Sequence, residues 1–279
     1  MSDAIVWNGM TQAALNVAYD NRAAVPLAAT WVQTWTDRSA ARRACHPSEL
    51  DVAYGPKPRN RFDVIRCGKR GAPLVVFIHG GWWQRNSKEV FTVMAEGPMV
   101  LGLDFALVGY TLAPEAGMTQ IAAEIRAGLD AIAAHQLARG LPGKVVLSGW
   151  SAGGHLTALC LDHPAVVAGL SISGVFDLEP IRLSNINDAV RMNAAEAAAN
   201  SPAKLPLSPK PLVLAYGTNE LPEMQRQSED FAKMRAAAGL PGEVLPIAGA
   251  DHFSIFDALT NSEGQLAQSL LRLGAAVPR

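Results

Sequence analysis

Residues 145–156, VVLSGWSAGGHL, decide the fold of this chain. An apolar run leads into the pattern G-x-S-x-G, and a stretch with helical character, His155 to Leu161, follows it. A strand, a sharp turn and a helix in this order are typical of the turn that exposes a nucleophilic serine. Gly149 and Gly153 carry no Cβ, so the helix can pack closely on the turn. We therefore expect Ser151 at the C-terminal end of a strand, with its hydroxyl raised above the sheet edge.

The segments on either side of this turn support a catalytic interpretation. Residues 79–83, HGGWW, come directly after the apolar run Leu74–Ile78. Downstream, Glu220 follows the apolar run Leu212–Ala215, and His252 comes late in the chain. A nucleophile, an acid and a histidine in this chain order are typical of α/β-hydrolases, so the pattern indicates a serine triad.

Short apolar runs alternate with helical stretches over most of the chain. Strands are expected at Phe62–Cys67, Leu74–Ile78, Asp104–Val108, Val145–Leu147, Ala168–Ile172, Leu212–Ala215 and Glu243–Ile247. Helices are expected at Ser87–Glu96, Thr119–Arg139, Ser151–Leu161 and Gln225–Ala238. This alternation predicts the α/β class, with a mostly parallel central sheet and helices on both of its faces.

The 279 residues are expected to form a single α/β-hydrolase domain, residues 1–279, whose main fold begins near Phe62. Residues 1–45 are rich in alanine and predict a helical N-terminal arm, in which Trp31 and Trp35 share one packing face. Residues 177–210 contain several prolines, and a short helix is expected at Ala189–Ala199. The position of this segment predicts a lid-like insertion over the site.

The serine needs a general base, because its hydroxyl is a weak nucleophile at its ordinary pKa. His252 is the predicted base, since it follows the last expected strand and precedes a closing helix. His155 lies four residues after Ser151 on the same expected helix and points away from the reacting centre, and His79 belongs to the glycine turn, which it can brace. The remaining histidines are expected on the surface: His46, His135 and His163.

An acid must orient this imidazole and stabilise the imidazolium as it forms. Glu220 is the predicted acid, because it stands at the C-terminal end of an expected strand. Glu223 and Asp251 are the alternatives. Glu223 is expected in the first turn of the next helix, where an acid complements the helix dipole. Asp251 adjoins His252 in the sequence, and neighbouring side chains usually diverge.

The tetrahedral oxyanion needs backbone donors, which are often the largest electrostatic contribution in acyl transfer. We expect them from Ala152, directly after the nucleophile, and from Gly81 and Trp82 in the glycine loop. An apolar wall for an aromatic leaving group is expected from nearby aromatic residues, although the same side chains could instead pack beneath the lid. These candidate substrate-binding residues are Trp82, Trp83, Trp150, Phe176 and Phe253.

Composition excludes several other functions. The net charge of −1 gives no reason to expect nucleic acid or an anionic membrane surface as a partner. Three widely spaced cysteines form no disulfide or metal motif, the histidines lack metal-ligand spacing, and no phosphate loop is present, so we expect no metal and no cofactor.

Residues 1–5 show no secretory signal and no long apolar run occurs, which favours a cytoplasmic protein without a membrane span. The expected partner is a small-molecule substrate, and a homodimer is left open.

Together the motifs resemble the kynurenine formamidases (arylformamidases), a branch of the α/β-hydrolases near the hormone-sensitive-lipase-type esterases. The matching stretches include H-G-G-x-W at residues 79–83, and further matches lie at residues 151–156, 173–180, 217–228 and 251–255. Two residues depart from the family pattern: Trp150 stands where a histidine is expected, and Glu220 replaces the usual aspartate. The resemblance implies the α/β-hydrolase fold and N-formylkynurenine as the named candidate substrate.

Three functions compete at this point. The leading one is a serine hydrolase that cleaves a small acyl amide or ester of an aromatic compound. The first alternative is a carboxylesterase of short-chain esters with no part in tryptophan breakdown. The second is a non-catalytic ligand-binding protein on a hydrolase fold. The complete triad and glycine loop favour an enzyme.

Overall fold

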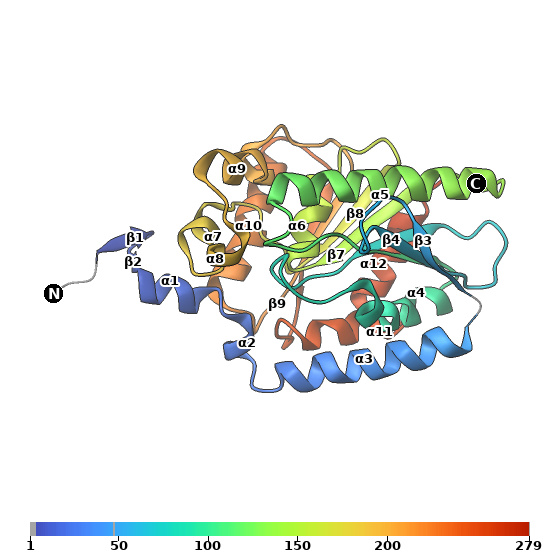
Figure 1. Ribbon diagram of the computed structural model, residues 1–279, viewed down its shortest axis with the longest axis horizontal. Helices are drawn as coiled ribbons and strands as arrows, with labels where there is room; N and C mark the ends of the chain where they lie inside the picture. The colour runs from blue at the N-terminus through green and yellow to red at the C-terminus, as the bar shows by residue number, and fades with distance from the viewer. Residues whose placement is uncertain (1–3, 47, 279) are drawn as a thin grey trace.

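Short apolar strands build an eight-stranded sheet at the centre of the computed structural model, which describes residues 4–46 and 48–278 (Figure 1). Its strand order is β10-β9-β8-β7-β5-β6-β4-β3. The strands are β3 (Ser48–Ala53), β4 (Arg61–Ile65), β5 (Leu74–Ile78), β6 (Asp104–Val108), β7 (Val145–Trp150), β8 (Val166–Ile172), β9 (Leu212–Gly217) and β10 (Gly242–Ile247). Neighbouring strands from β10 to β6 pair in parallel, whereas β4 is antiparallel to both β3 and β6. The predicted α/β class with a mostly parallel sheet is confirmed.

The centre of the sheet is buried on both faces, which is why its central strands are almost wholly apolar. In β5, Val76 and Ile78 belong to one core, and Val75 and Phe77 belong to the core on the opposite face. Figure 1 shows α5 and α3 on opposite sides of the sheet. The first core packs against α5 (Met118–Ala138), α6 (Ala152–Leu159) and α10 (Pro222–Ala237). The second packs against α3 (Ala28–Cys45), the 3₁₀ helices η1 (Lys88–Ala95) and η3 (Ser254–Phe256), α11 (Asp257–Thr260) and α12 (Gln265–Gly274), with α4 (Glu96–Val100) beside them.

The N-terminal arm is only partly helical, which corrects the prediction for residues 1–45. A hairpin of β1 (Ile5–Trp7) and β2 (Met10–Thr11) precedes the helices α1 (Gln12–Ala18), α2 (Asn21–Ala24) and α3. Asn8 and Gly9, with φ of 43° and 77°, form its turn. The dipeptide Asn-Gly is a strong hairpin signal, because both residues adopt the left-handed backbone that such turns require. The described residues begin at residue 4. Residues 1–3, which belong both to the predicted arm and to the segment expected to lack a secretory signal, therefore lie outside them.

The sheet begins before Phe62, which is a second correction. The edge strand β3 pairs with β4 from Ser48 to Ala53. Its sequence, SELDVA, is polar and mostly exposed or half-buried, as expected of an edge strand that must not aggregate. This polarity explains why no apolar run marks the strand in the sequence.

Residues 177–210 form a chain of short helices: α7 (Glu179–Leu183), α8 (Asn187–Val190), α9 (Ala194–Ala199) and the 3₁₀ helix η2 (Pro202–Lys204). The single helix expected at Ala189–Ala199 is therefore split. Arg191 takes a left-handed conformation after α8, and Asn193 caps α9 through its side chain. The arm lies against this segment, since Gln12 of α1 donates a hydrogen bond to the carbonyl oxygen of Leu183. Movement of the segment as a lid stays a prediction.

Within the described ranges, no helix combines the length and the apolar character needed to cross a lipid bilayer.

Candidate active site

Strand β7 carries Ser151 to the C-terminal edge of the sheet, and α6 begins at the next residue. Ser151 has φ of 56° and ψ of −118°, a backbone conformation that non-glycine residues rarely adopt. The close approach of the helix explains both glycines of the motif. A Cβ on Gly153 would lie 2.0 Å from the carbonyl oxygen of Ile78 in β5, and one on Gly149 would lie 2.3 Å from that of Gly153. The strand, strained turn and helix thus occur as the sequence predicts.

His252 follows β10 and Glu220 follows β9, and the fold brings their side chains into contact. Nδ1 of His252 lies 2.9 Å from Oε2 of Glu220, and both residues are buried. The other carboxylate oxygen, Oε1, accepts hydrogen bonds from Oγ of Ser173 at 2.6 Å and from the backbone N–H of Gly217 at 2.7 Å. Three donors therefore fix the carboxylate. Because an ionised carboxylate only accepts, this contact places the proton of a neutral imidazole on Nδ1 and leaves Nε2 as an acceptor.

The two alternative acids have other partners. Oε2 of Glu223, in the first turn of α10, accepts a hydrogen bond from the Tyr19 hydroxyl at 3.0 Å, and the same carboxylate pairs with Arg226. Oδ1 of Asp251 accepts the backbone N–H groups of Phe253 and Ser254, which caps the turn after His252. Among the described residues, Glu220 is therefore the candidate acid that touches the histidine.

Two of the other histidines are buried and held neutral. Nε2 of His155 lies 2.7 Å from the carbonyl oxygen of Asn200. Nδ1 of His79 lies 3.0 Å from the carbonyl oxygen of Gly80, and its ring stacks on Tyr110. Complete burial lowers the pKa of each imidazole to about 4. The sequence interpretation of both residues agrees with these positions.

The three histidines expected on the surface differ from one another. His46 is exposed, and His135 is half-buried with Nε2 2.9 Å from a carboxylate oxygen of Glu49. His163 is buried, which corrects the prediction. Its Nδ1 accepts the backbone N–H of Ala165, so the ring closes the turn before β8. None of the three lines the cavity beside Ser151.

The glycine loop after β5 lies directly against the serine turn. A Cβ on Gly80 would lie 2.6 Å from the carbonyl oxygen of Trp150, so no larger residue fits there. Asn86 donates a hydrogen bond to the Gly80 carbonyl oxygen, and the carbonyl oxygen of Gly81 accepts the N–H of Arg85. These bonds fix the loop while its own N–H groups stay available.

The three predicted oxyanion donors lack competing partners. Gly81 and Trp82 have φ of 118° and 51°, and within the described part of the chain their backbone N–H groups donate no hydrogen bond. Ala152 is the first residue of α6, where N–H groups have no partner inside the helix. The arrangement is therefore able to stabilise an oxyanion held near Ser151.

A small cavity of about 60 Å³ opens beside the serine. We call it the active-site cavity, and its lining residues are Asn21, Arg22, Val32, Gly81, Trp82, Arg85, Asn86, Trp150, Ser151, His252 and Phe253. Three of the five predicted substrate-binding aromatics are among them: Trp82, Trp150 and Phe253.

The other two aromatic residues pack in the core, which corrects their assignment. Trp83 is fully buried and meets the His155 ring edge-on, at 5.1 Å between ring centroids. Phe176 is buried and stacks on Phe231 of α10, at 4.6 Å. Both side chains turn inward because their apolar rings fill space beneath α6 and α10, as the alternative interpretation allowed.

Trp150 has a second contact that the sequence did not reveal. Its indole Nε1 donates a 2.9 Å hydrogen bond to the carbonyl oxygen of His252, and its ring lies against Trp35 and Phe256. Trp35 of α3 is buried, in agreement with the packing interpretation. Trp150 thus fixes the backbone of the loop that carries His252.

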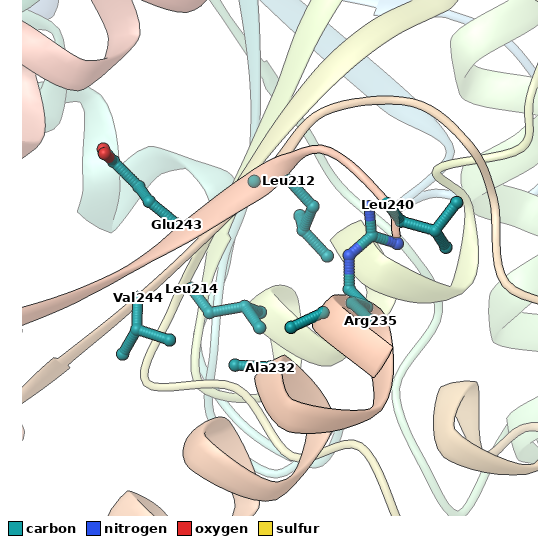
Figure 2. A pocket seen from close by; sticks show the side chains of 9 residues that line it. Leu212, Leu214, Ala232, Arg235, Leu240, Glu243 and Val244 are labelled. Atoms are coloured by element: carbon teal, nitrogen blue, oxygen red, sulfur yellow. The ribbon is translucent and has the colours of Figure 1, made fainter. Parts of the chain in front are cut away.

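A separate pocket lies between β9, β10 and α10 (Figure 2). Aliphatic side chains line most of it, and its two charged side chains already have partners. The guanidinium of Arg235 donates to the carbonyl oxygens of Ser208, Lys210 and Pro241, and Glu243 pairs with Arg272. Residues 4–46 and 48–278 also contain no group of three His, Cys, Asp or Glu side chains placed to hold a metal ion.

Known proteins resemble this chain in sequence and in fold. The family model BD-FAE matches residues 65–164. A solved structure described as a thioesterase from Silicibacter sp. TM1040 has a TM-score of 0.80 and 27% identity, covering 92% of this chain and 98% of that chain. Kynurenine formamidases from Salmo salar and Danio rerio are 31% and 30% identical, each over 80% of this chain and 81% of the relative. The chain belongs to the kynurenine formamidase family.

Membership in this family confirms the predicted α/β-hydrolase fold and the predicted enzyme class. The protein is a serine hydrolase that acts on esters or amides. The non-catalytic alternative is therefore wrong.

Sequence reasoning missed several residues at the site. Ser173 lies in the stretch 173–180 that carried the family resemblance, so its position was marked but its contact with Glu220 was not. Asn21 and Arg22 come from the arm, and Arg85 follows the glycine loop. No local pattern signals these three, because they meet the serine only through the packing of distant segments.

Proposed function

We propose that this enzyme hydrolyses a small acyl amide of an aromatic amine, with N-formylkynurenine as the named candidate. One observation carries the proposal: His252, held at 2.9 Å by the buried carboxylate of Glu220, lines the same cavity as Ser151. The similarity to kynurenine formamidases supports the substrate class. A cavity of about 60 Å³ suits a group as small as formyl.

In the first half of the proposed reaction, Oγ of Ser151 attacks the carbonyl carbon while Nε2 of His252 takes its proton. The carbonyl oxygen becomes an oxyanion, and the N–H groups of Gly81, Trp82 and Ala152 stabilise it. Glu220 stays ionised and stabilises the imidazolium. The imidazolium then gives its proton to the departing arylamine nitrogen as the carbon–nitrogen bond breaks.

In the second half, water attacks the acyl-serine carbonyl and His252 takes a proton from that water. The same N–H groups hold the second oxyanion. When it collapses, the bond to Ser151 breaks and the imidazolium returns the proton to Oγ. The products are the arylamine and formate (or another small carboxylate).

Two aromatic side chains of the active-site cavity would receive the leaving group. Trp82 and Phe253 both line the cavity. An aromatic leaving group gains from such contacts through its apolar area and its ring quadrupole. This part of the proposal rests on two residues and excludes Trp83 and Phe176, which lie in the core.

The direct test combines labelling and turnover. A fluorophosphonate probe should label the wild type at Ser151 and should leave Ser151→Ala unlabelled. The value of kcat/KM for N-formylkynurenine should equal or exceed that for phenyl acetate. No turnover of N-formylkynurenine by labelled, folded enzyme would refute the formamidase proposal.

Short-chain ester hydrolysis is the second candidate. The triad and the oxyanion donors serve an ester as well as an amide. The small cavity accepts the acyl group of either substrate. His252 can protonate either leaving group. An ester preference of several orders of magnitude in kcat/KM would assign the enzyme to the carboxylesterases.

The proposal also includes a cytoplasmic location and a small-molecule substrate. The cysteines Cys45, Cys67 and Cys160 are free, which supports a reducing compartment. Neither nucleic acid nor a membrane is proposed as a partner. Sedimentation of the purified protein would decide whether it forms a homodimer.

A further inference from the structure

The N-terminal arm forms one wall of the active-site cavity. Asn21 and Arg22 of α2, together with Val32 of α3, line the same cavity as Ser151 and His252. The arm is therefore placed to contact whatever the serine attacks.

Asn21 is the most informative residue of this wall. Its side chain is only 4% exposed, yet neither Nδ2 nor Oδ1 has a hydrogen-bond partner in the protein. Burying an unpaired amide is unfavourable, and buried polar groups in native proteins nearly always have partners. Asn21 lines the cavity beside the nucleophile, so its unpaired amide is a candidate partner for a polar group on the ligand.

Two arginines stand beside this amide. Arg22 and Arg85 line the active-site cavity, and both are exposed at its mouth. Within residues 4–46 and 48–278, neither guanidinium takes part in an ion pair, whereas other arginines such as Arg43, Arg66 and Arg226 do. Among the described residues, the cavity mouth therefore carries two positive charges that form no ion pair.

The same two arginines and Trp82 also line a second hollow of about 130 Å³, here called the arm hollow. Its other lining residues are Asn16, Tyr19, Asp20, Gln84, Asn185 and Ile186. The active-site cavity, at about 60 Å³, holds little more than the acyl group. Because the two hollows share Trp82 and both arginines, a leaving group that extends past Trp82 reaches the arm hollow and the arginines.

We propose that Asn21, Arg22 and Arg85 form a subsite for the carboxylate of a leaving group that carries an amino-acid head. This inference rests on the proposed function, and it adds the part of the substrate that sets specificity. A guanidinium presents paired N–H donors that match a carboxylate, and Nδ2 of Asn21 supplies a further donor. Asp20, at the rim of the arm hollow, is available to an ammonium group, although its Oδ1 also caps α2.

N-formylkynurenine has this chemistry. Its formamide lies at one end, and an aliphatic chain ending in a carboxylate and an ammonium lies at the other. Neutral aryl formamides and phenyl acetate lack the charged head. The subsite therefore predicts a preference among substrates that share the same reacting group.

The test compares matched substrates in the full-length enzyme. The measured quantity is kcat/KM for N-formylkynurenine divided by kcat/KM for the neutral 2-formamidoacetophenone. Arg22→Gln and Arg85→Gln should each lower this ratio about tenfold, the effect of losing one charge-assisted hydrogen bond. Arg70→Gln changes an exposed arginine outside both hollows and should leave the ratio unchanged.

A binding measurement keeps this test independent of formamidase activity. L-kynurenine should inhibit phenyl acetate hydrolysis competitively, and its Ki should rise about tenfold in Arg22→Gln and in Arg85→Gln. Asn21→Leu replaces an unsatisfied amide with an apolar side chain of similar size. It should raise the Ki while the melting temperature holds or increases, which a purely structural role would not produce.

The possible outcomes separate the two proposals. If N-formylkynurenine is not a substrate but the Ki shifts appear, the formamidase proposal fails and the subsite stands. If N-formylkynurenine is hydrolysed but neither the ratio nor the Ki changes in the arginine variants, the subsite is refuted and the formamidase proposal stands. An equal change in Arg70→Gln would also refute the subsite.

Discussion

Replacing Glu220 with glutamine should nearly abolish turnover, for a reason that the hydrogen bonds of the carboxylate supply. Oε1 accepts the backbone N–H of Gly217 and the hydroxyl of Ser173, and Oε2 accepts Nδ1 of His252. The N–H of Gly217 cannot become an acceptor. The amide oxygen of the variant must therefore face Gly217, which turns its NH₂ group toward the histidine.

An NH₂ group opposite Nδ1 requires that nitrogen to accept, so the imidazole proton moves to Nε2. A protonated Nε2 cannot take the proton of Ser151, and the neutral amide no longer stabilises the imidazolium. The equivalent change in a Ser-His-Asp triad lowers kcat by about 10⁴. A factor of this size corresponds to about 5 kcal/mol of lost transition-state stabilisation.

The assay is kcat for phenyl acetate, with a thermal melt of each variant to exclude misfolding. Glu223→Gln is the matched control, because Glu223 is also a buried carboxylate near the same loop but contacts Tyr19 and Arg226. It should keep kcat within about twofold of wild type, since it touches no reacting group. Glu220→Asp should fall between the two, because the shorter side chain no longer reaches Nδ1. The reasoning is refuted if folded Glu220→Gln keeps a tenth of wild-type kcat, or if Glu223→Gln loses more.

Four further predictions follow from the same contacts. Ser151→Ala should lower kcat by about 10⁴ or more and leave the melting temperature close to wild type; substantial residual turnover would place the nucleophile elsewhere. Gly153→Ala should destabilise the protein severely in urea unfolding, because its Cβ would lie 2.0 Å from the carbonyl oxygen of Ile78, and an unchanged midpoint would contradict that contact. Burial lowers the pKa of His155 to about 4, below its unfolded value of about 6.5, so its contribution to stability is full above pH 6.5 and declines toward pH 4. His155→Gln should therefore flatten the fall in the free energy of unfolding between pH 7 and pH 4.5; an equally steep fall would show that His155 does not contribute. Dialysis against a chelator should leave kcat unchanged, and activity restored only by added metal would overturn the expectation of a metal-free site.

The parts of the site that short segments encode were predictable from the sequence. The serine turn and the glycine loop depend on backbone conformation and on missing Cβ atoms, which glycines at fixed spacing report directly. Gly80, Gly149 and Gly153 make the close contacts that their positions in the motifs indicate. The central strands were equally readable, because burial on both faces leaves a continuous apolar run.

The edge and arm of the molecule were less readable, for physical reasons. Strand β3 is polar because it lies at the sheet edge, so it resembles a loop in the sequence. The hairpin of the arm was signalled by Asn8 and Gly9, a local pattern that the alanine-rich surroundings concealed.

Local rules of backbone conformation and hydrophobic pattern thus established the fold class from the sequence, and they predicted the nucleophile and the loop of the oxyanion donors. Only the tertiary structure decided between Glu220, Glu223 and Asp251, because that choice depends on which carboxylate faces Nδ1 of His252 across two strands. It also sent Trp83 and Phe176 into the core and brought Asn21 to the cavity. A side chain's direction and its neighbours are set by the packing of segments far apart in the chain, and no local pattern records them.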